Sequence, residues 1–155
     1  MRNITTTITA LIAISLIALT ANTHALEPFK VSKIISVYDG DTFRVNIDGI
    51  HPLLGDNIGI RVNNVDTPEI KGKCPSEKKL AIKARDFVAS RLKSAKEVLL
   101  VNPKRGKYFR IVADVMIDGQ MLDKILLKRG LAYQYDGAVQ GLYRYLLLRF
   151  LSSGM

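Results

Sequence analysis

Hydrophobic and polar residues alternate along three segments in the first half of the chain, and this period of two predicts half-buried β-strands. The three segments are Phe29–Tyr38, Thr42–Ile47 and Ile58–Val65. Asp39-Gly40, between the first two, is a signal for a tight turn. The stretch Asp48–Gly59 contains three Gly and one Pro and predicts a long loop. Three consecutive strands joined in this way predict a meander, in which the third strand runs in the same direction as the first.

The second half of the chain begins with helical spacing. Pro75-Ser76 is a start signal for a helix. Apolar residues then recur at steps of mostly three and four, at Leu80, Ala84, Phe87, Val88 and Leu92. Glu97–Val101 and Phe109–Ile117 predict two more strands, and Met121–Arg129 predicts a short helix that ends at Gly130. Five strands with two or three helices predict a mainly β, α+β fold, a five-stranded OB-type barrel with the helices packed on it.

The N-terminal 25 residues have the three parts of a signal peptide. Arg2 gives a positive start, Ile8–Leu19 is mostly apolar, and Thr23-His24-Ala25 is a small-x-small cleavage pattern before Leu26. The apolar run is too short for a comfortable transmembrane helix. We therefore expect a signal peptide over 1–25, a folded domain over 26–137 and an exported protein, periplasmic or secreted. An uncleaved anchor is the alternative.

Composition adds a positive charge to this picture. The chain has 155 residues, which fits one domain, and its 23 Lys and Arg against 14 Asp and Glu give a net charge of +9. A basic excess suits a polyanion such as nucleic acid, or an acidic membrane surface. It also occurs in proteins that are merely soluble and basic, so charge alone does not decide between these classes.

Two acidic turns carry the first candidate chemistry. They are Asp39-Gly40-Asp41-Thr42 and Asp66-Thr67-Pro68-Glu69. Either alone is more typical of an ordinary turn, because Asp, Gly and Pro dominate turns for backbone reasons. In a meander, however, the end of the third strand lies at the same end of the sheet as the turn after the first, so Asp41 and Asp66 come close together. Two carboxylates at short range favour a hard divalent cation such as calcium.

Three further residues complete a candidate site for phosphate chemistry. Arg61, on the third strand, and Arg110, on the fifth, present rigid forks of donors that match phosphate oxygens. Glu69, beside the acidic pair, can orient or deprotonate a water molecule. The chain has two His residues and one Cys, so no cluster of zinc ligands exists.

In this order, the motifs resemble those of the staphylococcal nuclease family. They are Asp39-Gly40-Asp41-Thr42, Arg61, Val65-Asp66-Thr67-Pro68-Glu69, Lys107-Tyr108-Phe109-Arg110 and Gly130-Leu131-Ala132-Tyr133. The resemblance covers Val31–Asp136. It implies a calcium-dependent endonuclease that cuts DNA and RNA and leaves 3′-phosphate ends.

The resemblance also implies roles for individual residues. Calcium would be held by Asp41, Asp66 and the carbonyl of Thr67. Glu69 would orient or activate water, while Arg61 and Arg110 would clamp the phosphate. The residues implied to contact the substrate are Lys107 and Tyr108, at a terminal phosphate, and Tyr133 or Tyr135, which would flank the nucleotide.

One departure from the family is Phe109, which stands where the family has Gly. If the backbone there needs a positive φ, Phe is strained; if it is ordinary strand, Phe109 simply packs. Because Phe109, Ile111 and Ala113 continue the alternation of the strand, we expect ordinary strand.

The second departure is the tail, residues 138–155. The family ends in an amphipathic helix, whereas Leu142–Leu151 is apolar on nearly every side, and a helix of that kind exposes an apolar patch. Exported members often carry a second Cys near the end that could pair with one placed like Cys74, but this chain has one Cys. We hypothesise that the tail is altered or truncated, and that the missing disulfide costs ~2–5 kcal/mol of stability. The alternative is a tail that packs in a new way.

Two other functions compete with the nuclease. One is a non-catalytic OB-type module that binds single-stranded nucleic acid. Three carboxylates beside a phosphate argue against it, because they repel the phosphate unless a cation lies between. The other is a membrane-associated protein that uses both apolar terminal segments. We expect a monomer with no stable membrane association after signal cleavage.

Overall fold

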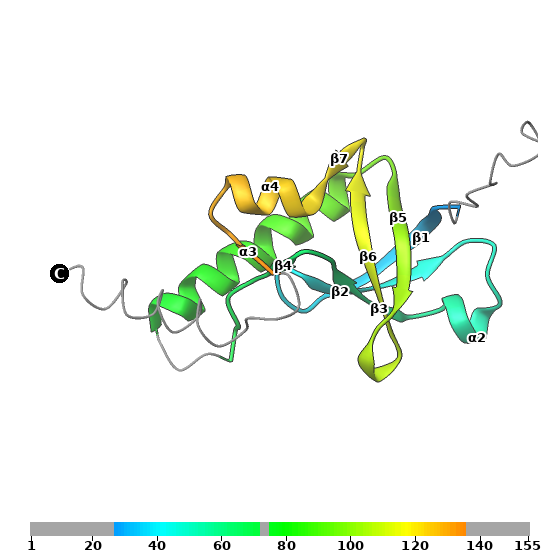
Figure 1. The fold of residues 1–155 in the computed structure, drawn as a ribbon, viewed down its shortest axis with the longest axis horizontal. Helices are drawn as coiled ribbons and strands as arrows, with labels where there is room; N and C mark the ends of the chain where they lie inside the picture. Colours follow the sequence, from blue (N-terminus) through cyan, green and yellow to red (C-terminus); the bar gives the residue numbers. More distant parts are fainter. Residues whose placement is uncertain (1–26, 72–74, 136–155) are drawn as a thin grey trace, which may run out of the picture.

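A closed barrel of five strands forms the body of the protein in the computed structural model, which describes residues 27–71 and 75–135 (Figure 1). The barrel strands are β1 (Phe29–Val37), β2 (Thr42–Ile47), β3 (Ile58–Val62), β5 (Val98–Arg105) and β6 (Arg110–Ile117). Three shorter strands are β4 (Val65–Asp66), β7 (Gln120–Met121) and β8 (Tyr133–Gln134). The helices are α2 (Pro52–Gly55), α3 (Pro75–Ser94) and α4 (Leu122–Lys128).

The pairing of the strands confirms the predicted meander and closes the barrel. β1 pairs with β2 and β2 with β3, both antiparallel. β5 pairs antiparallel with β1 and with β6. β3 and β6 pair in parallel, which joins the two ends of the sheet. A parallel pair needs a long crossover connection, and here the chain between the two strands contains α3 and β5. The expected OB-type, mainly β, α+β fold is confirmed.

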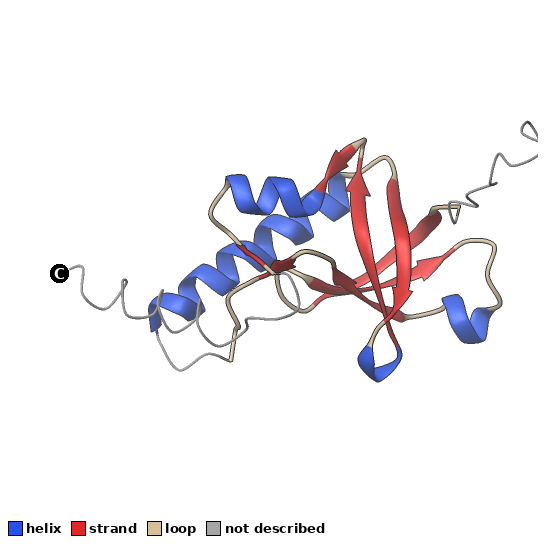
Figure 2. Cartoon of the chain, viewed as in Figure 1, coloured by secondary structure: helices blue, strands red, loops and turns tan. Residues whose placement is uncertain are grey.

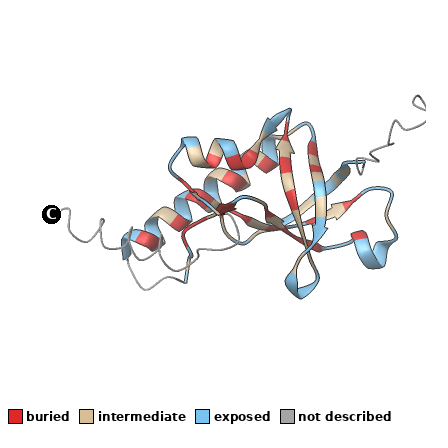
Figure 3. Cartoon of the chain, in the orientation of Figure 1, coloured by how far each residue is buried: buried red, intermediate tan, exposed pale blue. Residues whose placement is uncertain are grey.

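The core follows the alternation in the sequence. Phe43, Val45 and Ile47 of β2 are buried, whereas Arg44 between them is exposed. On α3 the helical spacing buries one face, made by Ala81, Ala84, Val88 and Leu92. α3 and α4 lie on the same side of the barrel (Figure 2), and buried positions recur on the strands and helices that meet in the core (Figure 3).

Three of the differences between the predicted and the observed elements lie before β6. The expected loop Asp48–Gly59 contains α2, which begins at Pro52 and whose first turn is capped by His51, because Nδ1 of His51 accepts a hydrogen bond of 3.2 Å from the amide of Leu53. The expected strand Ile58–Val65 divides into β3 and β4 at a turn where Asn64 has a φ of 63°. β5 continues to Arg105 across an irregularity in its pairing with β6.

Some of the expectations concern residues outside the described ranges. These are the signal peptide at 1–25, Cys74 and the apolar tail at 138–155. Within residues 27–71 and 75–135, no helix combines the length and hydrophobicity that a bilayer span requires.

Gly40 lets the first acidic turn pack closely against the second one and against α3. A Cβ on Gly40 would lie 2.7 Å from Cγ2 of Thr67 and 2.9 Å from Cβ of Ala84. Neither atom belongs to the far end of a flexible side chain. The absence of a side chain at Gly40 therefore brings Asp41 within reach of Thr67.

We expect Gly40→Ala to lower the free energy of unfolding by about 1–3 kcal/mol, because the added methyl group overpacks this contact. Urea unfolding followed by circular dichroism measures the change. Thr67→Ser removes Cγ2, so the double variant should be more stable than the sum of the two single effects predicts. Strict additivity would contradict the contact.

Candidate active site

Asp41 is the most buried member of the candidate site, with an exposed fraction of 1%. Its position is fixed by the backbone, because its carbonyl accepts a hydrogen bond of 2.8 Å from the amide of Val62 on β3. One carboxylate oxygen, Oδ2, accepts from the amide of Thr67 at 2.7 Å. The other, Oδ1, accepts from the hydroxyl of Thr42 at 3.0 Å and from Nη1 of Arg61. The first acidic turn is thus tied to β3 and to the second acidic turn.

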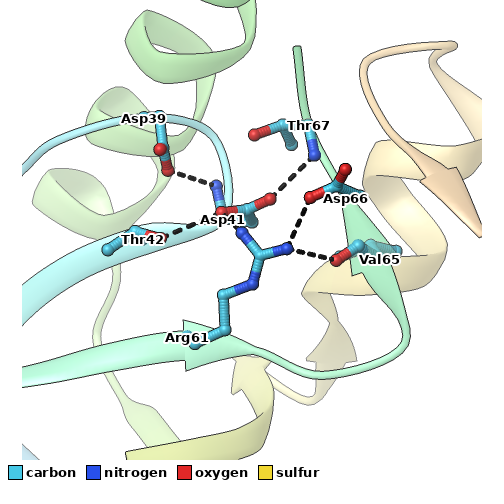
Figure 4. A network of polar contacts seen from close by, with 7 residues as sticks. All are labelled: Asp39, Asp41, Thr42, Arg61, Val65, Asp66 and Thr67. Carbon is cyan, nitrogen blue, oxygen red and sulfur yellow. Dashed lines mark hydrogen bonds and ion pairs between the residues drawn. The ribbon is translucent and has the colours of Figure 1, made fainter. Parts of the chain in front are cut away.

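Arg61 joins the two acidic turns through its guanidinium group (Figure 4). Nη1 forms an ion pair with Asp41, and Nη2 forms one with Asp66 at 2.6 Å. Nη2 also donates to the carbonyl of Val65 at 3.3 Å. The predicted proximity of Asp41 and Asp66 is therefore confirmed by a shared partner. Arg61, expected to clamp a phosphate, is in this structure the link between the two carboxylates.

The pKa values of Asp41 and Arg61 are shifted by burial and by the charges around them. Burial raises the pKa of Asp41 from its ordinary 3.8 to about 6, although Arg61 lowers it, and Asp39 adds to the rise. Burial lowers the pKa of Arg61, but the carboxylates of Asp41 and Asp66 outweigh this effect, so its pKa lies above the ordinary value. At neutral pH the ionised form of Asp41 predominates, next to a permanently charged arginine.

A cleft of about 240 Å³ opens beside this network. Its wall includes five of the predicted site residues: Arg61, Asp66, Thr67, Glu69 and Arg110. Asp41 lies directly behind it, hydrogen-bonded to two of them. The structure therefore brings all the predicted catalytic and metal-ligating residues to one place.

Arg110 reaches the cleft because β3 leaves room for it. Gly59 is its partner in the parallel pairing of β3 and β6. A Cβ on Gly59 would lie 2.9 Å from Cγ of Arg110. The Nε of Arg110 donates to the carbonyl of Lys107 at 3.4 Å, which further restrains the side chain. Glycine at position 59 thus lets the arginine lie across the neighbouring strand.

The four predicted substrate contacts lie off the wall of the cleft. Lys107 and Tyr108 form the tip of the β5–β6 hairpin, where Tyr108 is 88% exposed. Tyr133 lies opposite Asp66 in the pairing of β8 with β4. Burial and then the charge of Glu77 raise the pKa of Tyr133. The amide of Tyr135 donates to the carbonyl of Asn64 at 2.8 Å. Tyr133 pairs with a residue of the cleft wall, but none of the four lines the cleft.

The expectation for Phe109 is wrong. Its φ is 56°, in the left-handed region, and Tyr108 before it has a φ of 57°. Regular pairing of β6 begins only at Arg110, because the three residues Lys107–Phe109 form a tight turn that reverses the chain between Gly106 and Arg110. Alternation along the sequence does not reveal where a turn ends and a strand begins. Phe109 is therefore a large side chain on a backbone that favours glycine.

Three residues of the cleft wall were not predicted: Tyr38, Ile70 and Lys71. Asp39 and Thr42, which belong to the first acidic turn, also line the cleft, and each forms a hydrogen bond with Asp41. Oδ1 of Asp39 accepts from the amide of Asp41 at 3.2 Å. The sequence signal that could have identified these five residues is their position within the two acidic turns or directly next to them.

The family model for staphylococcal nuclease homologues matches residues 59–146, more than half of the chain. The chain belongs to the staphylococcal nuclease family. The match begins at Gly59, so Asp41 comes to the site from outside the matched residues, whereas the other predicted site residues lie within them. A search of curated proteins gave no significant match.

The ligand atoms that this staphylococcal nuclease homologue offers are of the type that calcium prefers. Calcium prefers oxygen ligands, and Asp41, Asp66 and Thr67 supply only oxygen atoms. The hydroxyl of Thr67 is buried without a hydrogen-bond partner. Within the described residues, no group of three or more His, Cys, Asp or Glu side chains is arranged to hold a metal ion. The predicted calcium site therefore contains two carboxylate side chains, those of Asp41 and Asp66. Calcium binding stays a prediction.

The raised pKa of Asp41 predicts a pH-dependent stability in the metal-free protein. A carboxyl group whose folded pKa lies above its unfolded value binds its proton more tightly in the folded state, so its contribution to stability falls as the pH rises. The fall should lie between about pH 4 and pH 6 and amount to at most about 3 kcal/mol. We expect the Asp41→Asn variant to lack this pH-dependent fall in stability.

Differential scanning calorimetry in a chelator, at about pH 4 and pH 7, measures this difference. Asp56→Asn, an exposed carboxylate outside the cleft, is the matched control and should leave the pH difference unchanged. An equal pH difference in Asp41→Asn and the parent protein would show that the pKa of Asp41 is not raised.

Proposed function

We propose that this chain is an exported, calcium-dependent endonuclease that hydrolyses phosphodiester bonds in DNA and RNA and leaves 3′-phosphate ends. The observation that carries the proposal is the composition of one cleft. Two arginines and Glu69 line it, and Arg61 is ion-paired to two carboxylates at its base. Membership of the staphylococcal nuclease family supports the same activity.

Each part of this arrangement has a place in phosphodiester hydrolysis. The guanidinium groups of Arg61 and Arg110 bind the phosphate oxygens, which gather negative charge as the bond is attacked. The carboxylate of Glu69 accepts a proton from water as the water oxygen forms its bond to phosphorus. The bond from phosphorus to the 5′ oxygen breaks beside Arg110, this oxygen takes a proton from solvent water, and Glu69 returns its proton to solvent. The phosphate stays on the 3′ oxygen.

Asp41, Asp66 and the carbonyl of Thr67 would hold the calcium ion. Held by these residues, calcium would supply Lewis-acid polarisation of a phosphate oxygen and charge stabilisation in the transition state. Calcium dependence is general in this family. The ion pairs of Arg61 with Asp41 and Asp66 keep the two carboxylates and the arginine on the same side of the cleft.

Residues around the cleft would bind the rest of the substrate. Lys107 and Tyr108, at the hairpin tip, would contact a terminal phosphate. Tyr133 or Tyr135 would flank the nucleotide. The net charge of +9 favours binding of a polyanion and makes it sensitive to salt.

The N-terminal segment supports export, to the periplasm or the medium. We propose that residues 1–25 are removed and that the mature protein works as a monomer without stable membrane association.

Glu69→Gln and Arg110→Ala test the chemistry. On single-stranded DNA with calcium, we expect Glu69→Gln to lower kcat by about 10²–10⁴ and Arg110→Ala by about 10²–10³. Glu69→Gln should keep its affinity for DNA, because it alters proton transfer and not phosphate contacts. Excess chelator should abolish cutting by the parent protein.

Lys83→Gln is the matched control, because Lys83 is an exposed charge on α3 outside the cleft. It should cut like the parent protein. Full activity in chelator would contradict the calcium dependence. DNA binding by a folded protein that never cuts would identify a binding module instead of an enzyme.

Export predicts where the protein is found in a bacterial host. The protein should be recovered from the periplasm by osmotic shock or from the culture medium. Its first residue should be Leu26, because the small-x-small pattern ends at Ala25. N-terminal sequencing of the released protein checks the cleavage site. Protein that leaves the cells only with detergent, and that keeps residues 1–25, would show an uncleaved anchor.

A further inference from the structure

A second hollow, of about 310 Å³, lies next to the cleft, between α2 and the tip of the β5–β6 hairpin. Its floor and walls are mostly apolar, with Phe29 and Ile58 from the barrel, Leu54 from α2 and Phe109 from the hairpin. Its volume is at the lower end of the range for ligand pockets. We call this hollow the hairpin groove.

Two large apolar side chains on opposite sides of the hairpin groove are unusually exposed. Leu54 has an exposed fraction of 51% and Phe109 one of 54%. The hairpin tip is the exposed end of the β5–β6 hairpin (Figure 3). Neither side chain therefore completes the core, and both are available to a ligand.

The backbone at Phe109 is strained for its side chain. Within the described residues, six non-glycine residues have a positive φ: Asn57, Asn64, Asn102, Tyr108, Phe109 and Asp118. Four of these are Asn or Asp, which tolerate the left-handed region. The two aromatic exceptions are adjacent, at the hairpin tip. Strain of this kind concentrates at functional sites.

The charge of the hairpin groove selects a polyanionic ligand. Lys104, Arg105 and Arg110 line it, and among the described residues that line it none is acidic. The guanidinium carbon of Arg105 lies 5.8 Å from the centre of the Phe109 ring. An aromatic face beside cations is the combination with which proteins bind the bases of single strands.

Arg110 connects the hairpin groove to the cleft, since its side chain lines both. A nucleotide strand whose phosphate is bound by Arg110 therefore has an apolar hollow directly beside that phosphate. An apolar peptide would gain nothing from the three cations, whereas a nucleotide uses both the cations and the apolar walls.

We propose that the hairpin groove is a subsite for an unpaired base of the substrate strand, next to the phosphodiester held by Arg110, with the base on the Phe109 ring and against Leu54. This assignment rests on the proposed nuclease function. It predicts a preference for single-stranded substrate, because a paired base cannot leave its stack to enter the hollow without breaking its pair.

The test uses the full-length chain, carrying Glu69→Gln to prevent cutting, with calcium present. The probe is a fluorescein-labelled oligothymidylate of about eight nucleotides, and its affinity is measured by anisotropy. In this background we expect Phe109→Gly to raise Kd about fivefold or more, the loss typical of one base–aromatic stack. Leu54→Ala should raise Kd in the same direction. Leu53→Ala, at a 78% exposed neighbour on α2 that does not line the groove, should change Kd by less than about twofold.

A second probe isolates the base from the phosphates. It is the same oligonucleotide with abasic residues in place of its nucleosides, so it keeps every phosphate. Phe109→Gly should leave its Kd unchanged, because nothing remains to stack on the ring. An equal loss of affinity for both probes would overturn the proposal.

The stability of Phe109→Gly gives an independent readout. Because glycine relieves the left-handed strain, Tm should stay the same or rise while affinity falls. If Tm falls and Kd is unchanged, Phe109 packs against the chain's own C-terminal segment or a second copy, and the proposal is wrong.

The proposed function and the subsite fail in different ways. If the parent protein neither binds nor cuts the thymidylate with calcium, the nuclease proposal fails and takes the subsite with it. If the parent protein cuts and binds it but Phe109→Gly and Leu54→Ala bind equally well, only the subsite is refuted.

Discussion

The arrangement of the site depends on the ion pairing of one guanidinium group with two carboxylates. Arg61 comes from β3, Asp41 from the turn before β2, and Asp66 from β4. Asp41 is almost completely buried, and a buried charge without a partner costs several kcal/mol. Because Arg61 compensates this charge and two donors, Thr42 and the amide of Thr67, add hydrogen bonds, three separate segments are held at one end of the barrel.

The closure of the barrel then determines which other residues can join this group. β3 pairs with β2 on one edge and with β6, in parallel, on the other. Parallel pairing sets Gly59 beside Arg110 and continues to Arg61 beside Val112. Two arginines separated by 49 positions in the sequence thus line one cleft. The long connection that contains α3 makes this pairing possible, so the helix contributes to the site without supplying a residue to it.

The sequence predicts the parts of this structure that rest on regular periodicity and direction. Alternation located β2, helical spacing located the buried face of α3, and the logic of a meander brought Asp41 close to Asp66. It could not predict features that depend on contacts between distant segments. One such feature is the position of Arg61 between the two carboxylates. The sequence places Arg61 on a strand and the carboxylates in turns, but it does not give the distances between their side chains. The left-handed φ of Phe109 is another, because the alternation from Phe109 to Ala113 is the same whether the strand begins at 109 or 110.

Two departures from local rules lie at the cleft and at the hairpin beside it, whereas the apolar core of the barrel is regular. In the core, apolar side chains occupy the inward positions that the strand period assigns to them. At the cleft, burial raises the pKa of a carboxyl group that must be ionised to hold a cation. At the neighbouring hairpin, two aromatic residues take a backbone conformation that suits glycine. Both features lower the stability of the metal-free protein, so a regular core has to offset them. A cation at the carboxylates would remove part of the cost at Asp41, and the free energy recovered would appear as binding affinity.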